Sequence, residues 1–246
     1  MLVLVTGASV GFGEAIARRF VSEGHQVIIL ARREQKLEAL REELGSACLK
    51  TIACDIAKIE RIEEELGEYA KEIDVLVNNA GLALGVASFD ECLREDFEEM
   101  IETNILGVVR ITHYLLPFMV KRGSGHIINL GSIAGNYPYP GGNVYGGTKA
   151  FLKQFSLNLR ADLVDKNIRV SNIEPGLCGG SEFSVVRFKG DRQRAEELYK
   201  NTHPLMPEDI AESVFWCANL PSHININSIE LMPTTQAFSP FRVHKQ

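Results

Sequence analysis

The chain has 246 residues, of which 45% are hydrophobic and 24% are charged, a balance that suits one globular α/β domain with a sizeable core. Its formal net charge of −6 argues against a general binder of nucleic acid or of anionic membranes. The five cysteines form no CxxC pair and the six histidines have no metal-ligand spacing, so we expect neither a disulfide framework nor a metal site.

The start of the sequence carries no basic segment followed by an apolar core and a small-residue cleavage site. No apolar run is long enough for us to expect a membrane-spanning segment. We therefore expect a cytoplasmic protein with free thiols and no membrane partner.

Short apolar runs alternate with helical patterns along the whole chain. Strands are expected at residues 2–5, 26–31, 48–53, 74–77, 126–130, 169–173 and 226–232, and helices at 14–23, 34–44, from about 58, at 95–121 and from 143. Pro117 is expected to kink the helix over 95–121 or to end its regular part. Such alternation predicts an α/β fold, a single-domain (1–246) Rossmann-type doubly wound seven-stranded parallel sheet with helices on both faces.

A glycine-rich turn, TGASVGFG at residues 6–13, lies between the first strand and the first helix. Glycines there let the backbone approach a pyrophosphate, which the helix N-terminus stabilises. The second strand ends in Ala31-Arg32-Arg33, where an NAD site would carry an acid. Two guanidiniums suit a 2′-phosphate, so the sequence predicts NADP; the alternative is a solvated helix start that Glu34 partly neutralises.

Tyr145 and Lys149 are four residues apart at the start of the helix from residue 143, so they share one helix face. An ammonium beside a phenol favours the phenolate and lowers the pKa of the tyrosine. Such a tyrosine suits acid–base catalysis near neutral pH. Pairs of this kind are also common on exposed helices, so this one gains meaning from the motifs before it.

Several ordered motifs together resemble the classical short-chain dehydrogenase/reductase family from Leu2 to at least Met232. They are the TGxxxGxG turn, NNAG at 78–81, Ser132, YxxxK at 145–149, and Pro175-Gly176. The stretches GLALG at 81–85, GGNVYG at 141–146, VRFKGD at 186–191, MPTTQ at 232–236 and VHKQ at 243–246 look like its NADP-dependent 3-hydroxy acid dehydrogenase group. That resemblance implies an oxidoreductase that interconverts small 3-hydroxy acids, such as L-serine and 3-hydroxypropanoate, and their 3-oxo acids.

The resemblance also implies the role of individual residues. Tyr145 would be the acid/base, Lys149 would lower its pKa and bind the nicotinamide ribose, and Ser132 would orient the carbonyl. Asn104 would hold a water against the lysine, unless it is simply a satisfied polar residue, and Asp55 could equally be a helix N-cap. The expected cofactor-binding residues are Gly7, Ser9, Gly11, Phe12, Gly13, Arg32, Arg33, Asp55, Ile56, Asn79, Ala80, Gly81, Tyr145, Lys149, Pro175, Gly176 and Leu177.

A small carboxylate substrate needs a cation near the nicotinamide. The segment 181–202 lies where the family carries its substrate lid, and it offers Arg187 and Lys189. We expect Arg187 to bind the substrate carboxylate beside Ser132 and Tyr145, with a surface role or Lys189 as the alternatives. Gly179-Gly180 would let the lid move. The role of Ser181 stays open, because it sits five residues after Gly176 where the family often has a threonine after four.

Two other functions remain open: a broad carbonyl or ketoacyl reductase on the same scaffold, and a non-catalytic NADP-sensing protein. A sensor needs no proton-transfer groups, so the complete set of Asn104, Ser132, Tyr145 and Lys149 argues against it. Family members pair the helices that carry Asn104 and Tyr145, commonly as tetramers. Surplus apolar residues on these helices agree with a homotetramer, and the tail 238–246 would dock on a neighbouring subunit.

Overall fold

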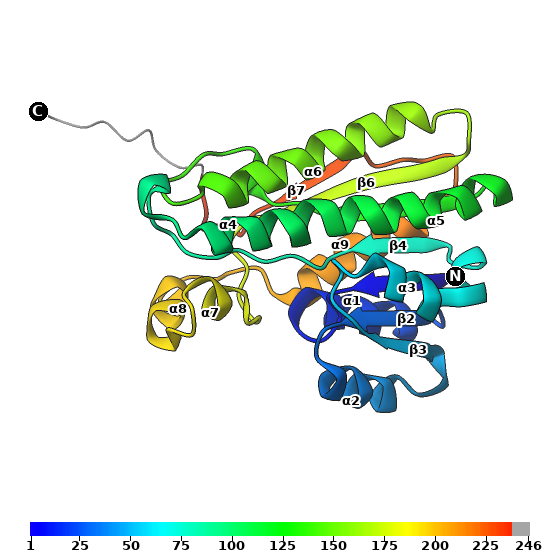
Figure 1. Ribbon diagram of the computed structural model, residues 1–246, viewed down its shortest axis with the longest axis horizontal. Coiled ribbons are helices and arrows are strands. Elements are labelled where there is room, and N and C mark those ends of the chain that lie inside the picture. Colours follow the sequence, from blue (N-terminus) through cyan, green and yellow to red (C-terminus); the bar gives the residue numbers. More distant parts are fainter. Residues whose placement is uncertain (238–246) are drawn as a thin grey trace, which may run out of the picture.

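Seven parallel strands form the centre of the computed structural model, which describes residues 1–237 (Figure 1). Their order across the sheet is β3-β2-β1-β4-β5-β6-β7. The strands are β1 (Leu2–Thr6), β2 (Gln26–Ala31), β3 (Cys48–Ala53), β4 (Val75–Asn78), β5 (Gly125–Leu130), β6 (Ile168–Pro175) and β7 (Ser228–Leu231). All neighbouring pairs are parallel, so the predicted doubly wound seven-stranded sheet is confirmed.

Helices connect successive strands and cover both faces of the sheet. They are α1 (Gly11–Ser22), α2 (Glu34–Leu44), α3 (Ile59–Leu66), α4 (Arg94–Ile101), α5 (Val108–Arg122), α6 (Asn143–Asp162), α7 (Phe183–Arg187), α8 (Arg192–Tyr199) and α9 (Pro207–Asn219). Short 3₁₀ turns occur at Gly45–Ala47, Gly67–Lys71, Phe89–Glu91 and Ile133–Gly135, and a π-helical segment, η4 (Glu102–Gly107), joins α4 to α5. The predicted elements exist, and their ends differ by a few residues.

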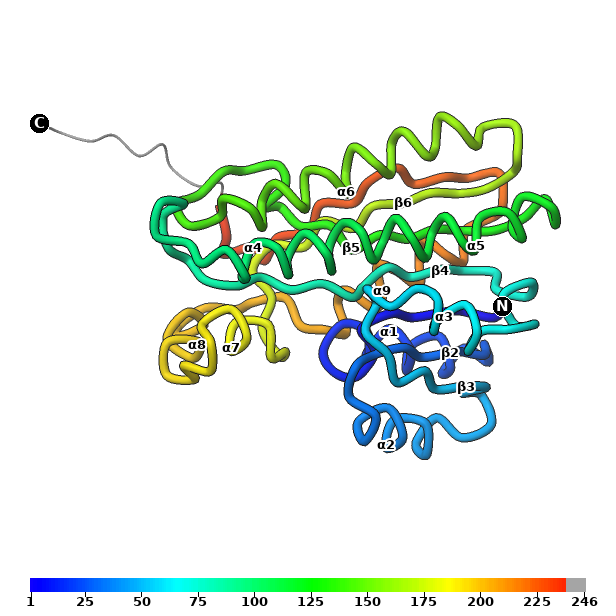
Figure 2. Tube along the Cα trace, in the orientation of Figure 1, coloured from blue at the N-terminus to red at the C-terminus, as the bar shows by residue number. Residues whose placement is uncertain are grey.

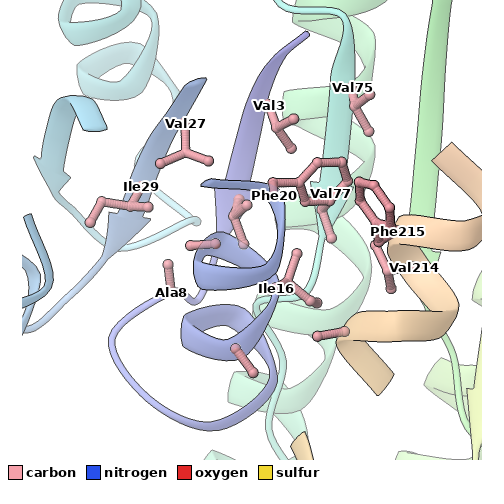
Figure 3. Packing of buried hydrophobic residues seen from close by; sticks show 14 of the residues in the cluster. Val3, Ala8, Ile16, Phe20, Val27, Ile29, Val75, Val77, Val214 and Phe215 are labelled. Atoms are coloured by element: carbon pink, nitrogen blue, oxygen red, sulfur yellow. The ribbon is translucent and has the colours of Figure 1, made fainter. Parts of the chain in front are cut away.

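Two apolar cores lie on opposite sides of the sheet because alternate strand residues point to opposite faces. Along β1, Val3 and Val5 face the core beneath α1, α2 and α9, whereas Leu2 and Leu4 face the core beneath α3 and α5. In the first core Phe20 of α1 packs edge-on against Phe215 of α9, with ring centroids 5.4 Å apart (Figure 3). Burial on both faces explains why the strands are continuously apolar.

Pro117 lies inside α5, which continues to Arg122, so the alternative in which it ends the regular helix is wrong. Proline removes the hydrogen bond to the carbonyl four residues earlier, here that of His113. Both residues are exposed, so that carbonyl can bind water instead. Regular α-helical geometry is interrupted elsewhere, at the π-helical η4 that carries Asn104.

The helical stretch Arg94–Arg122 has 29 residues, and an 18-residue window within it has a mean hydropathy of 1.2. Contrary to the expectation from sequence, it is long and apolar enough to cross a membrane by length and composition alone. In this fold Ile111, Leu115 and Met119 of that stretch are buried against the sheet. These buried residues belong to the 39% of the window that is buried inside the fold.

The carboxyl ends of the strands meet at one edge of the sheet, and the predicted site residues follow these ends. The glycine turn follows β1, Asn79 follows β4, and Ser132 follows β5. Helices α7 and α8 lie beyond the same edge, next to the start of α4 and α6 in the tube view (Figure 2). In open α/β sheets ligands bind at this edge.

Candidate active site

The turn between β1 and α1 forms an open backbone cradle. Gly7 has a φ of 67°, and a Cβ added to it would lie 2.8 Å from the Cα of Ala80. A Cβ on Gly11 (φ 60°) would lie 2.8 Å from the Cβ of Ser181 in the segment that covers the turn. Only glycine fits at these points, and the cradle lies at the N-terminus of α1. This geometry fits a pyrophosphate.

The end of β4 is fastened to this turn through Thr6. Its Oγ1 accepts hydrogen bonds from the backbone N–H groups of Asn79 (3.0 Å) and Ala80 (2.9 Å). The Asn79 amide donates back to the carbonyl of Thr6 at 2.8 Å. A Cβ on Gly81 would lie 3.2 Å from Asn104 Oδ1 and 3.5 Å from Lys149 Nζ. The segment 79–81 therefore runs between the glycine turn and these two polar groups.

Arg33 lies beside the glycine turn, where its Nη2 donates to Ser9 Oγ at 3.0 Å. The more exposed Arg32 lies 3.8 Å from Asp55 and 3.5 Å from Glu99. Two guanidiniums next to the cradle fit a 2′-phosphate.

Asp55 and Ile56 follow β3 at the same edge. Asp55 Oδ1 accepts from Ala57 N at 3.0 Å, which stabilises the turn before α3; the cap position of that helix is Lys58. The alternative role of Asp55 as the helix N-cap is therefore wrong. Ile56 is buried, and the absence of a side chain on Gly107 leaves room for it.

Ser132, Tyr145 and Lys149 come together at the ends of β5 and α6. Tyr145 is 9% exposed and Lys149 is 7% exposed. Lys149 Nζ donates to the carbonyl of Leu130 at 2.7 Å and lies 5.8 Å from the centroid of the Tyr145 ring. Ser132 Oγ accepts from Ala134 N at 3.1 Å and is hydrogen bonded to Tyr145.

Burial dominates the pKa values of this pair. It raises the pKa of Tyr145 well above its usual value, against opposing effects of the hydrogen bond from Ser132 and the charge of Arg187. Burial also lowers the pKa of Lys149 to about 8. The expectation that the ammonium lowers the tyrosine pKa is therefore wrong for the protein alone. Desolvation of the phenolate outweighs the lowering effects of Ser132 and Arg187, and the Lys149 ammonium itself loses its proton above about pH 8.

Asn104 is completely buried in the π-helical segment η4. Its Oδ1 accepts from Leu82 N at 2.9 Å, and its Nδ2 donates to Leu82 O at 2.8 Å and to Thr148 Oγ1 at 3.1 Å. Thr148 in turn donates to the Tyr145 carbonyl at 2.8 Å. The Asn104 side chain thus ties the segment after β4 to the helix that carries Tyr145.

A cavity of about 370 Å³ opens beside Ser132 and Tyr145. Phe12, Pro175, Gly176 and Leu177 also line it, together with Ser181 from the covering segment. The backbone after β6 is held in place because Gly176 N donates to Leu231 O at 2.7 Å and Leu177 N donates to Gln236 Oε1 at 2.7 Å.

Arg187 of α7 lies in the wall of this cavity. Its guanidinium carbon is 5.3 Å from the ring centroid of Tyr139 and 5.7 Å from that of Tyr145. It donates to Tyr139 Oη at 2.8 Å and to Gly85 O at 3.3 Å. Lys189 instead pairs with Asp96 at 2.7 Å and does not line the cavity. Of the two lid cations, Arg187 is therefore the one that the structure brings to Ser132 and Tyr145.

The model of the short chain dehydrogenase family matches residues 1–189. This chain belongs to that family. A relative named NADP-dependent 3-hydroxy acid dehydrogenase YdfG, from Salmonella typhi, is 56% identical over the full length of both chains. A serine 3-dehydrogenase from Agrobacterium fabrum is 50% identical over 99% of this chain and 98% of its own.

Solved structures agree with this assignment. A structure described as the closed form of serine dehydrogenase complexed with NADP⁺ has a TM-score of 0.96 at 54% identity, with both chains fully covered. The serine dehydrogenase from Escherichia coli has a TM-score of 0.84 at 49% identity, over 97% of this chain and all of the other.

The sequence did not predict several of the side chains that line this cavity. Tyr137 and Tyr139 line the cavity from the segment between β5 and α6, and Tyr199 and Gln236 line it from α8 and from the residues after β7. Aromatic residues next to prolines in Tyr137-Pro138-Tyr139-Pro140 were a usable signal, because they lie between Ser132 and Tyr145. Gln236 ends the MPTTQ stretch at 232–236, which contributed to the family resemblance but indicated no role for this residue.

The residues described, 1–237, contain no group of His, Cys, Asp or Glu side chains that could hold a metal ion. All five cysteines are free, as predicted. Cys178 lines the cavity, and burial raises the pKa of its thiol to about 12.

The depressed pKa of Lys149 predicts a pH dependence of stability. Between about pH 8 and 10.5 the folded chain loses a proton that the unfolded chain keeps, so stability rises with pH. Relative to Lys149→Met, we expect the free energy of unfolding of the parent to rise by about 1–2 kcal/mol from pH 7.5 to 9.5. Urea denaturation of the cofactor-free proteins measures this, with the exposed Lys121→Met as the control. A difference that stays constant over this range would contradict the buried ammonium.

Proposed function

We propose that this chain is an NADP-dependent oxidoreductase that interconverts small 3-hydroxy acids and their 3-oxo acids. The observation that carries the proposal is one arginine, Arg187, in the wall of the cavity that Ser132 and Tyr145 share. Relatives named for 3-hydroxy acid and serine dehydrogenation, which are 56% and 50% identical over almost the whole chain, support it. The function is that of an enzyme and not of an NADP sensor.

The proposed cofactor site consists of the glycine cradle, the segment 79–81, Asp55 and Ile56, and the residues after β6. Arg33 and Arg32 would bind the 2′-phosphate, because guanidiniums pair with phosphate through several hydrogen bonds. The name of the Salmonella typhi relative specifies NADP, which supports this choice over NAD.

When bound, NADP supplies or accepts the hydride, and side chains of this protein handle the proton. The raised pKa of Tyr145 keeps its proton in place at neutral pH, ready for transfer to the substrate oxygen during reduction. Ser132, hydrogen bonded to Tyr145, would donate to the same oxygen and orient it. Lys149 would bind the nicotinamide ribose from its fixed position on the Leu130 carbonyl.

Arg187 would bind the substrate carboxylate. Among residues 1–237 its hydrogen bonds to protein groups use Nε and Nη2, so both protons of Nη1 remain for a ligand. A carboxylate that enters this cavity and loses water needs such a partner, because an unpaired buried charge is costly. The cation therefore selects an acid over a neutral ketone of the same size.

Tyr145→Phe tests the proton transfer. We expect kcat for NADP-dependent oxidation of L-serine or 3-hydroxypropanoate to fall by about 10²–10⁴, because the acid–base group is lost. NADPH absorbance gives the rate, and NADPH fluorescence titration should show that the variant still binds the cofactor. A variant as fast as the parent would refute this chemistry, and a parent that oxidises no hydroxy acid would refute the substrate class.

Arg187→Ala tests carboxylate recognition, with Lys189→Ala as a matched control whose cation lies outside the cavity. We expect kcat/KM for 3-hydroxypropanoate to fall at least about 30-fold in Arg187→Ala, corresponding to about 2 kcal/mol, and to change little in Lys189→Ala. A neutral ketone of similar size, assayed in parallel, should lose little. Equal losses on both substrates would favour a broad carbonyl reductase.

We also propose a homotetramer in the cytoplasm, with the segment 181–202 as the substrate lid of one domain over 1–246. Exposed apolar side chains on the helices of the predicted interface support the assembly: Ile101 (38%), Leu106 (37%) and Leu157 (39%). Phe151 and Phe155, half-buried and with stacked rings 5.6 Å apart, add apolar area on another flank of α6. Five free cysteines are consistent with a reducing compartment. The predicted docking of the tail 238–246 lies outside the described residues.

The tetramer predicts a mass four times that of the 27.3 kDa chain in sedimentation equilibrium. Leu157→Arg places a charge in the proposed interface and should yield smaller species, because burying it without a partner is unfavourable. Val164→Arg, at a residue that is 69% exposed beyond the end of α6, is the control. A monomeric parent at micromolar concentration would contradict the proposal.

A further inference from the structure

The lid segment 181–188 has a left-handed backbone position at each end. Gly180 before it has a φ of 67°, and Lys189 and Gly190 after it have φ values of 53° and 95°. Residues with positive φ are common where a chain changes direction sharply. The segment that contains helix α7 is therefore bounded at each end by a sharp change in the direction of the chain.

The far end of this piece is tied to the loop after β4 and to α4. The backbone N–H of Gly85 donates to Arg187 O at 3.0 Å, and the Arg187 side chain donates back to Gly85 O. Lys189 pairs with Asp96 of α4. The two hydrogen bonds between Arg187 and Gly85 hold the end of the lid that borders the substrate cavity, and the half-exposed Lys189 pair lies outside it.

The near end is tied across the proposed cofactor groove, which runs over the glycine turn at residues 6–13. The side chain of Glu182 makes this connection. One carboxylate oxygen lies 2.5 Å from Arg33 Nη1, and the other lies 2.9 Å from Lys36 Nζ of α2. Lys36 and Arg33 together hold the pKa of the Glu182 carboxyl below its usual value. Glu182 is thus ionised at neutral pH and bridges two cations about 150 residues earlier in the chain.

The lid covers the glycine turn at the residue just before the Glu182 tie. Ser181, next to Glu182, touches the Gly11 backbone so closely that no side chain fits there. Arg33 is also held by Ser9 of the same turn. These contacts form a closed ring over the cradle. Ser9 of the glycine turn is hydrogen bonded to Arg33, Arg33 pairs with Glu182, and the adjacent Ser181 packs on Gly11 of the same turn.

We propose that Glu182 is a positioning residue that holds the lid closed across the cofactor groove and limits the rate of cofactor release. The inference rests on the proposed function, in which this groove binds NADP. Glu182 takes one N–H of Arg33 Nη1 and one of the three on Lys36 Nζ, so donors remain for a 2′-phosphate. The latch and the cofactor can therefore engage the same cations together.

Glu182→Gln removes the charge and keeps the size of the side chain. We expect the dissociation rate of NADPH, from stopped-flow fluorescence without substrate, to rise about fivefold at low salt. The amides of α7 in the NADPH complex should exchange hydrogen faster. Glu197→Gln is the matched control, because within residues 1–237 the ion pair of Glu197 is with Lys200 of the segment 181–202. It should change neither measurement.

Two further measurements separate a charge latch from general damage to the lid. The difference between parent and Glu182→Gln should shrink at high salt, and it should persist with NADH, which has no 2′-phosphate. In a Lys36→Gln background, Glu182→Gln should have a smaller effect than in the parent, because half of the bridge is already absent.

An unchanged NADPH dissociation rate in Glu182→Gln would overturn the latch. A slower release would also overturn it, since it would mean that the carboxylate competes with the 2′-phosphate for Arg33. Neither result depends on turnover. Failure of the latch is therefore distinguishable from failure of the proposed function, which would appear as absent oxidation of hydroxy acids by the parent enzyme.

Discussion

The burial of the Lys149 ammonium against the Leu130 carbonyl is the constraint on which the site depends. A lysine at 7% exposure needs a fixed acceptor, and β5 provides one where its last backbone carbonyl meets α6. Once α6 is held there, Tyr145 one turn earlier must lie beside Ser132, which follows the same strand. The Asn104–Thr148 hydrogen bond fixes the same helix from its other side.

The predictable part of the fold is the part that depends on local sequence. Continuous apolar runs and strand–helix alternation predicted the sheet, and the glycine turn and YxxxK spacing predicted the family, which the family match confirms. The sequence left open whether Pro117 kinks the helix or ends its regular part. The free-energy cost of a proline inside a helix depends on whether the freed carbonyl faces water, which is a property of the folded chain. The π-helical η4 was missed because no residue type marks it.

The residues of the candidate site could be predicted where they lie together in one sequence motif. They were harder to predict where segments far apart in the sequence meet in the fold. Sequence reasoning left Arg187 and Lys189 as alternatives because they are two residues apart on one lid. Only the fold places one beside Tyr145 and the other on Asp96. The pKa of Tyr145 was predicted in the wrong direction, since counting a neighbouring charge ignores the larger effect of desolvation.

The Arg187 guanidinium lies 5.7 Å from the centroid of the Tyr145 ring. At this distance, the proposed carboxylate-binding group can influence the protonation of the proposed acid/base. The guanidinium charge favours the phenolate, so an anion seated on Arg187 would cancel that influence and strengthen the tyrosine's hold on its proton. By thermodynamic reciprocity, a protonated Tyr145 would bind such an anion more tightly than an ionised one. On the proposed assignment, binding of an acidic substrate would thus favour the protonated form of Tyr145. An uncharged ketone of equal size would not have this effect.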